Sequence, residues 1–177
     1  MLAAVVGIVS FGSVYIVWKE TAKPHAPAVP VVSICKSPAP GMKRIPGKGG
    51  YQFDFLQEQF YMHEGVSDSP PWRFAFSLEP KDGTAALAIN FRDSTMNRMV
   101  WDRAYNFSGH VEHRQIFDEQ GHPIGEDYWG YWENGERWRR FLLFKGGINA
   151  TYDLADTTEA ALFDRVLNST CILDVAP

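Results

Sequence analysis

The sequence predicts a mainly β (α+β) protein: an N-terminal transmembrane helix, a Pro-rich linker, and an antiparallel sheet (a sandwich or half-barrel) with one C-terminal helix. Apolar and polar residues alternate after Gly50, the pattern of half-buried strands. Strand patterns come first and one helical pattern last, so a parallel sheet of alternating strands and helices is excluded. The predicted organisation is 1–19 as anchor, 20–50 as linker and 51–177 as β domain.

The N-terminal anchor rests on residues 2–18, which carry no charge. As a helix they span about 25 Å, close to the hydrocarbon core of about 30 Å, and Trp18 and Lys19 suit the interface. The alternative is a cleavable signal peptide. No Lys or Arg precedes the apolar run, and the nearest A-x-A-like triplet, Ala26-Pro27-Ala28, contains a proline, so we expect the helix to be retained in the lipid bilayer.

The sequence carries opposing signals about the side of the membrane on which the domain lies. Lys19 and Lys23 favour a cytoplasmic domain by the positive-inside tendency. The cysteines, Cys35 and Cys171, bracket the domain, and we predict a disulfide between them, which requires an oxidising compartment. Three asparagines lie in N-x-S/T sequons, informative only in a eukaryotic protein: Asn106, Asn149 and Asn168. We therefore expect an extracytoplasmic domain, periplasmic or extracellular.

The predicted linker is punctuated by six prolines between residues 24 and 46, which disfavour both helix and central strands. Its one apolar run, 29–35, is expected as an edge strand, where Pro30 is tolerated because an edge N–H needs no partner.

Four further segments predict strands, and one predicts a helix. The strand patterns are 72–78, 85–91, 99–107 and 111–117. A hairpin is expected over 128–144, because Asn134-Gly135 favours a two-residue turn with positive φ. Asp156 and Glu159 have the spacing of a capping box, followed by an apolar stripe at helical spacing, which predicts a helix over about 157–169.

The sequence contains no motif for catalysis or for cofactor binding. The net charge of −4 argues against nucleic-acid binding. His110 and His113 point to opposite faces of a strand, and His122 lies in the following turn, so no metal site is expected. No phosphate-binding loop or nucleophile motif is present. We expect no enzyme activity and no cofactor.

The hairpin is the candidate binding site. With a two-residue turn, Trp132 faces Arg137 and Arg139 faces Gly130, so a partner carboxylate has access to Arg139. Trp, Tyr and Arg are enriched in binding hot spots. The alternative is a solvated face on which arginines stack over tryptophans. The predicted partner-binding residues are Trp132, Arg137, Arg139 and Tyr128.

These features predict a membrane-anchored, non-enzymatic interaction domain, an accessory or structural subunit that binds other membrane protein subunits. Two alternatives remain open. A curved sheet closed by a C-terminal helix resembles lipocalin-like barrels, which bind small molecules, although no G-x-W signature is present. The other alternative is an extracytoplasmic immunity or inhibitor protein.

Overall fold

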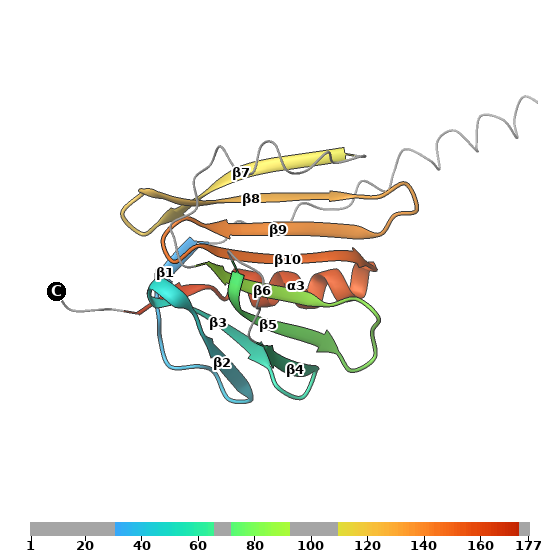
Figure 1. Ribbon diagram of the computed structural model, residues 1–177, viewed down its shortest axis with the longest axis horizontal. Helices are drawn as coiled ribbons and strands as arrows, with labels where there is room; N and C mark the ends of the chain where they lie inside the picture. The colour runs from blue at the N-terminus through green and yellow to red at the C-terminus, as the bar shows by residue number, and fades with distance from the viewer. Residues whose placement is uncertain (1–30, 66–71, 93–109, 174–177) are drawn as a thin grey trace, which may run out of the picture.

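The alternating segments form one curled sheet in the computed structural model, which describes residues 31–65, 72–92 and 110–173. Figure 1 shows the strands wrapped around a single helix. The strands are β1 (Val31–Ile34), β2 (Met42–Pro46), β3 (Tyr51–Leu56), β4 (Phe60–Gly65), β5 (Trp72–Pro80), β6 (Leu87–Arg92), β7 (His110–Asp118), β8 (Pro123–Tyr131), β9 (Arg137–Leu143), β10 (Ile148–Ala155) and β11 (Cys171–Ile172). A short 3₁₀ turn, η1 (Lys48–Gly50), precedes β3.

The strand order is β2-β3-β11-β1-β7-β8-β9-β10-β6-β5-β4. All pairings are antiparallel except those of β1, which runs parallel to both β11 and β7. The described part of the chain is therefore mainly β, and its sheet is a curled half-barrel, as predicted.

Two strands, β1 and β2, come from the range 20–50 that the prolines marked as linker. The prediction that the run 29–35 lies at an edge is wrong, because β1 is in the interior of the sheet between β11 and β7. Val31 is aligned with Phe117 and Ser33 with Cys171. Pro30 itself lies outside the described residues.

The helix α3 (Thr157–Asn168) packs inside the curl. It contacts β10 and β9 on one side and β3 on the other, so both halves of the sheet close on it (Figure 1). Phe163 carries this packing: its ring is 5.2 Å from that of Tyr152 and 6.2 Å from that of Phe60, centroid to centroid. Burial of such aromatic side chains is the main source of stability in a core of this kind.

The predicted capping box at the start of α3 is confirmed. Asp156 Oδ1 accepts from the amides of Thr158 (2.7 Å) and Glu159 (2.8 Å), and Glu159 Oε2 accepts from the amide of Asp156 (3.0 Å). The second oxygen of Glu159 accepts from the amides of Thr84 and Ala85. The cap therefore also fixes the loop before β6.

The predicted disulfide between Cys35 and Cys171 is present, with Cα atoms 4.9 Å apart and a sequence separation of 136. It joins the residue after β1 to the start of β11. Cys35 N also donates to Ile172 O (2.9 Å). The first and last strands of the described chain are thus held together covalently and by their parallel pairing.

The anchor at 1–19, the strand expected at 99–107 and the sequon at Asn106 lie outside the described residues. Within the described ranges, no helix has the length and apolar character needed to cross a membrane.

Candidate functional site

The β8–β9 hairpin closes through a longer turn than the sequence predicted. Trp132 N donates to Glu136 O (2.8 Å) and Gly135 N donates to Trp132 O (2.9 Å). Gly135 has φ +87°, where a residue without Cβ is favoured. Tyr131, rather than Trp132, is aligned with Arg137. The predicted register was wrong by one residue, because the turn contains the whole stretch from Trp132 to Glu136.

A one-residue change of register redistributes side chains between the two faces of a sheet. Arg139 is aligned with Trp129, and Gly130 with Trp138. Arg137 and Arg139 therefore share the face that turns toward α3, whereas Tyr128 lies on the opposite face. The four predicted residues do not form one surface.

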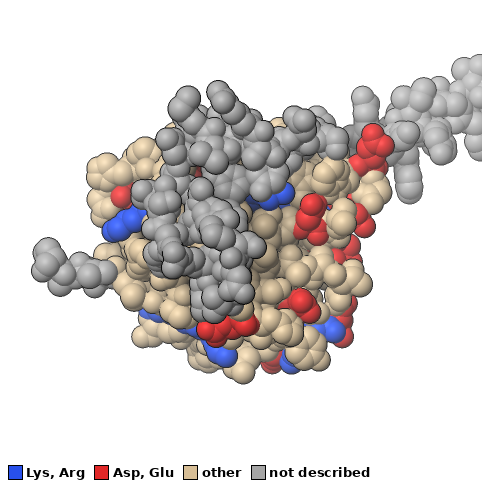
Figure 2. Space-filling model, in the orientation of Figure 1, with Lys and Arg blue, Asp and Glu red and all other residues tan. Residues whose placement is uncertain are grey.

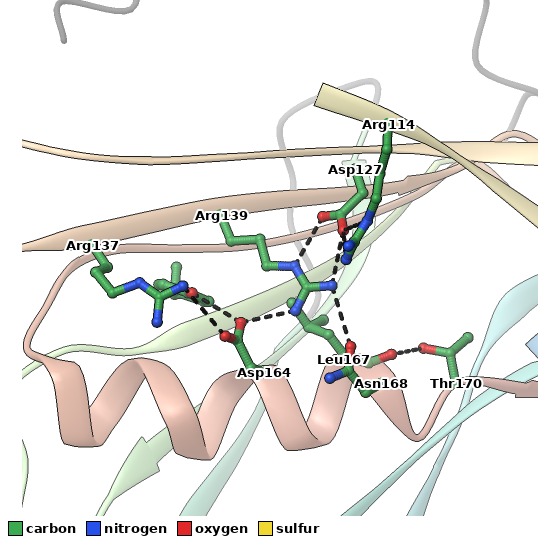
Figure 3. Close-up of polar contacts among 9 residues, drawn as sticks. Arg114, Asp127, Arg137, Arg139, Asp164, Leu167, Asn168 and Thr170 are labelled. Carbon is green, nitrogen blue, oxygen red and sulfur yellow. Dashed lines mark hydrogen bonds and ion pairs between the residues drawn. The ribbon is translucent and has the colours of Figure 1, made fainter. Parts of the chain in front are cut away.

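Arg139 is at the centre of a buried charge cluster between β9 and α3 (Figure 3). Its side chain has no exposed surface. Its guanidinium donates to both carboxylate oxygens of Asp127 (2.9 Å each), to Asp164 Oδ1 (2.8 Å) and to Asn168 Oδ1 (3.3 Å). The expectation that Arg139 receives a carboxylate from a partner is corrected, since its carboxylates come from β8 and α3 of the same chain.

Three further groups complete the cluster. Arg114 Nη2 lies 2.7 Å from Asp127 Oδ2, and Arg137 Nη2 lies 3.6 Å from Asp164 Oδ2. Tyr152 donates its hydroxyl to Asp164 Oδ1 (3.0 Å). Figure 3 shows Arg137 and Arg139 reaching from the sheet to Asp164 on the helix. The cluster fixes the position of α3 on the sheet.

Burial and charge act in opposite directions on the guanidinium of Arg139. Burial lowers its pKa, but the charges and hydrogen bonds of Asp127 and Asp164 outweigh this effect and raise the pKa above its ordinary value. Burial, with the charge of Asp164, raises the pKa of the Tyr152 hydroxyl. Both groups therefore keep their protons at neutral pH, so Arg139 is a cation and Tyr152 a hydrogen-bond donor.

A second group, which we call the tip surface, consists of Trp132, Asp153 and Leu154. Trp132 Nε1 donates to Asp153 Oδ1 (2.7 Å), which also accepts from Leu154 N (3.0 Å). Between Tyr152 and Ala155, β10 advances by three residues while β9 advances by two, from Arg139 to Arg137. This bulge turns Leu154 outward.

Leu154 combines two unusual properties. Its φ is +52°, and it is the one non-glycine residue with positive φ in the described part of the chain. Its side chain is 58 % exposed. A bulky apolar residue in this conformation is uncommon and costs free energy. Packing within the described chain does not compensate the cost of this conformation, because the Leu154 side chain is largely exposed to solvent.

The surroundings of the tip surface are acidic. Figure 2 shows acidic side chains gathered on the side of the molecule where Figure 1 places the β8–β9 turn. Glu133 and Asp156 are exposed there, as is Asp153 itself, and Glu136 is half-buried. The exposed charged side chains described around Leu154 are therefore mainly acidic.

The remaining predicted residues lie elsewhere. Tyr128 stacks on His113 with ring centroids 4.4 Å apart and donates its hydroxyl to Glu126 Oε2 (2.7 Å). Arg137 is half-buried in the charge cluster. Of the four predicted residues, Trp132 belongs to the tip surface.

Sequence analysis missed Leu154 because Tyr152 and Leu154 continue a period-two pattern, which places both in the core. The bulge after Tyr152 has no local sequence signal. Among the described residues, no group of three or more His, Cys, Asp or Glu side chains is arranged to hold a metal ion.

No protein-family model matches this sequence, and no curated protein matches it.

Proposed function

We propose that this protein is a membrane-tethered, non-enzymatic interaction domain, an accessory subunit of an extracytoplasmic membrane complex, and that it binds its partner through the tip surface. The observation that carries the proposal is Leu154, an exposed leucine held at φ +52° on a bulge. Strained residues of this kind cluster at functional sites.

The strain at Leu154 requires a compensating interaction. A left-handed conformation costs an L-residue about 1–2 kcal/mol. Asparagine tolerates this region better, and glycine adopts it freely. A leucine recovers the cost only when its side chain is buried, and a fully buried leucine gains about 1.5–3 kcal/mol. A partner that covers Leu154 together with Trp132 supplies this burial.

The acidic surroundings specify the partner further. A complementary surface has an apolar pocket for Leu154, rimmed by Lys or Arg that meet Glu133 and Asp156. Rim charges of this kind chiefly raise the association rate, and salt screens them. Binding through the tip surface is therefore expected to weaken with ionic strength mainly through slower association.

The tip surface also suits a tethered protein. It lies at the opposite end of β8 and β9 from β1, the first described strand of the chain (Figure 1). A membrane-proximal β1 would leave the tip surface pointing away from the bilayer. The disulfide supports an oxidising compartment, because such bonds persist there.

The test compares capture of partners from detergent-solubilised native membranes by the wild-type protein, by Leu154→Asn and by Tyr61→Asn. Tyr61 is the matched control, since it is 56 % exposed but lies on the edge strand β4. We expect Leu154→Asn to weaken the measured Kd for the captured subunit by about 2 kcal/mol, and to raise the free energy of unfolding by about 1 kcal/mol as strain is relieved. Tyr61→Asn should leave the Kd unchanged.

Equal capture by the wild-type protein and by Leu154→Asn would contradict the proposal that the partner binds the tip surface. Capture of a soluble toxin or enzyme, instead of a membrane subunit, would favour the immunity or inhibitor alternative. The lipocalin-like alternative requires a ligand chamber inside the curl, where α3 and the Arg139 cluster are packed.

A further inference from the structure

A cavity of about 290 Å³ lies at the end of the half-barrel opposite the tip surface. It forms where β1, β3 and β11 meet the turns that join β7 to β8 and β9 to β10. Mouths of β-barrels are a common place for ligand sites, and this volume is at the lower end of the range of about 300–1,000 Å³ for such sites. Since one water occupies about 30 Å³, the cavity accommodates a molecule of about ten non-hydrogen atoms.

The walls of the cavity are apolar. They are formed by Val32, Ile124, Phe144 and Ile172. Val32 is buried and lies beside Asp118 in the sheet, and Ile172 lies beside Tyr51. These positions are set by strand register, with the disulfide close by at β11, so the cavity is preformed and its ligand has a compact apolar body.

Apart from one carboxylate, every polar side chain of the cavity can donate a hydrogen bond. Lys145, Gln120 and Tyr51 supply an ammonium, an amide and a hydroxyl. The one carboxylate, Asp118, already accepts from the amides of Gln120 (2.9 Å) and His122 (2.8 Å) and lies 3.2 Å from His122 Nδ1. Lys145 is exposed and makes no ion pair with another residue of the described ranges.

We propose that this cavity is a binding site for a small monocarboxylate with an apolar or aromatic body, held by Lys145 and Tyr51. The ligand carboxylate pairs with the ammonium of Lys145 and accepts a hydrogen bond from the hydroxyl of Tyr51. Charge-assisted bonds of this kind are stronger than neutral ones. The ligand body replaces water against the four apolar walls.

Tyr51 is suited to donate. Burial, and next the charge of Asp118, raise the pKa of its hydroxyl above the ordinary value of 10.0. It therefore keeps its proton at neutral pH. An amine ligand is repelled by the ammonium of Lys145, and the one carboxylate that attracts it, Asp118, is already engaged by two backbone amides and lies beside His122.

The experiment uses full-length protein in lipid nanodiscs and fluorine NMR of para-fluorophenylacetate. Its cationic counterpart, para-fluorobenzylamine, has a similar shape, and empty nanodiscs give the blank. We expect saturable binding of the carboxylate, at least about tenfold tighter than that of the amine, since the amine cannot form the charged hydrogen bond with Lys145. Lys145→Gln should weaken binding by about tenfold, and Tyr51→Phe by about threefold to fivefold.

The matched control is Lys43→Gln, which removes an exposed lysine on β2 outside the cavity. Its affinity should equal that of the wild-type protein. Lys145 is exposed, so its variant is expected to fold, and a melting curve checks this. The proposal is overturned by the absence of saturable binding, by equal affinity for the amine and the carboxylate, or by unchanged affinity in Lys145→Gln. None of these outcomes affects the tip surface, which is at the other end of the molecule.

Discussion

Arg139 is the largest fully buried side chain of the described residues, and its five N–H donors demand partners in fixed directions. Asp127 on β8 meets it side-on with two bonds of 2.9 Å, and Asp164 meets it from α3. Burying such charges costs free energy, and this cost is compensated only when the charged groups have well-placed partners and hydrogen bonds. Other rotations of α3 would leave Arg139 without Asp164, so this residue selects one orientation of the helix.

Replacing Arg139 with methionine tests this role. The change leaves Asp127 and Asp164 without their shared guanidinium in a largely buried site, so we expect the free energy of unfolding to fall by about 3–5 kcal/mol. Chemical denaturation measures it. Arg165→Met, on the exposed side of the same helix, is the control and should change stability by less than about 0.5 kcal/mol. A small, equal effect of both substitutions would show that the cluster does not hold α3.

Asn149 shows how a sequence signal loses its meaning in the fold. It lies in an N-x-S/T sequon but is only 5 % exposed, within the interior strand β10. The sequon at Asn168 places its side-chain oxygen against Arg139. Neither position presents a free surface asparagine, so these two sequons do not indicate the compartment. The disulfide is the stronger clue.

At the scale of elements, the helix cap connects α3 to the loop before β6. Burial raises the pKa of Glu159, but hydrogen bonds from the amides of Ala85, Asp156 and Thr84 outweigh it, and the pKa is lowered from its ordinary value of 4.5. A carboxyl with a depressed folded-state pKa stabilises the fold at pH values above 4.5. That stability is lost as the pH falls through the lowered pKa.

Glu159→Gln should therefore reduce the decrease in the free energy of unfolding that accompanies acidification. Glutamine has nearly the same shape but no charge. We expect the wild-type protein to be the more stable at pH 7 and the difference to shrink as the pH falls below 4.5, the unshifted value. Urea unfolding at a series of pH values measures it. A difference that stays constant with pH would contradict the assignment, and Glu58→Gln, at an exposed position, is the control.

The elements that the sequence predicted well are those with local signals. Alternation located the strands around Phe76, Ile89 and Ile116, and the Asp156–Glu159 spacing located the helix. The register of β8 on β9 was missed, because it depends on how many residues the turn contains. The interior place of β1 was missed because its partners, β7 and β11, are far along the chain. Asp164, which pairs with the buried Arg139, lies 25 residues from it in the sequence. No local sequence pattern could therefore predict the pairing.

At the scale of the whole molecule, the disulfide closes a loop of 136 residues. On the chain-entropy model such a loop stabilises the fold by about 5 kcal/mol at most, because it restricts the unfolded chain. The double variant Cys35→Ser, Cys171→Ser should lose stability up to this amount in thermal or urea unfolding. An unchanged midpoint would contradict this. In native protein, alkylation without reductant should find no free thiol, and two free thiols would place the domain in the cytoplasm.

The predicted anchor is tested on the native protein. We expect its intact mass to include residues 1–19, because no basic residue precedes the apolar run and no favourable cleavage site follows it. Fractionation should then leave the protein with the membrane after a carbonate wash. A mature start near Val29 would identify a signal peptide and remove the tether from the proposed function.

The position of the disulfide also determines how the molecule responds to mechanical load. Cys35 directly follows β1 and Cys171 opens β11, so the covalent bond connects the two places where tension enters from the chain ends. Force applied to both ends passes from residue 35 to residue 171 across the sulfur atoms, and the 136-residue loop between them carries none of it. Pulled in this way, the chain extends only outside the disulfide, so β1 and Ile172, which line the cavity, are exposed to the load, while the strands from β2 to β10, α3 and the tip surface remain folded.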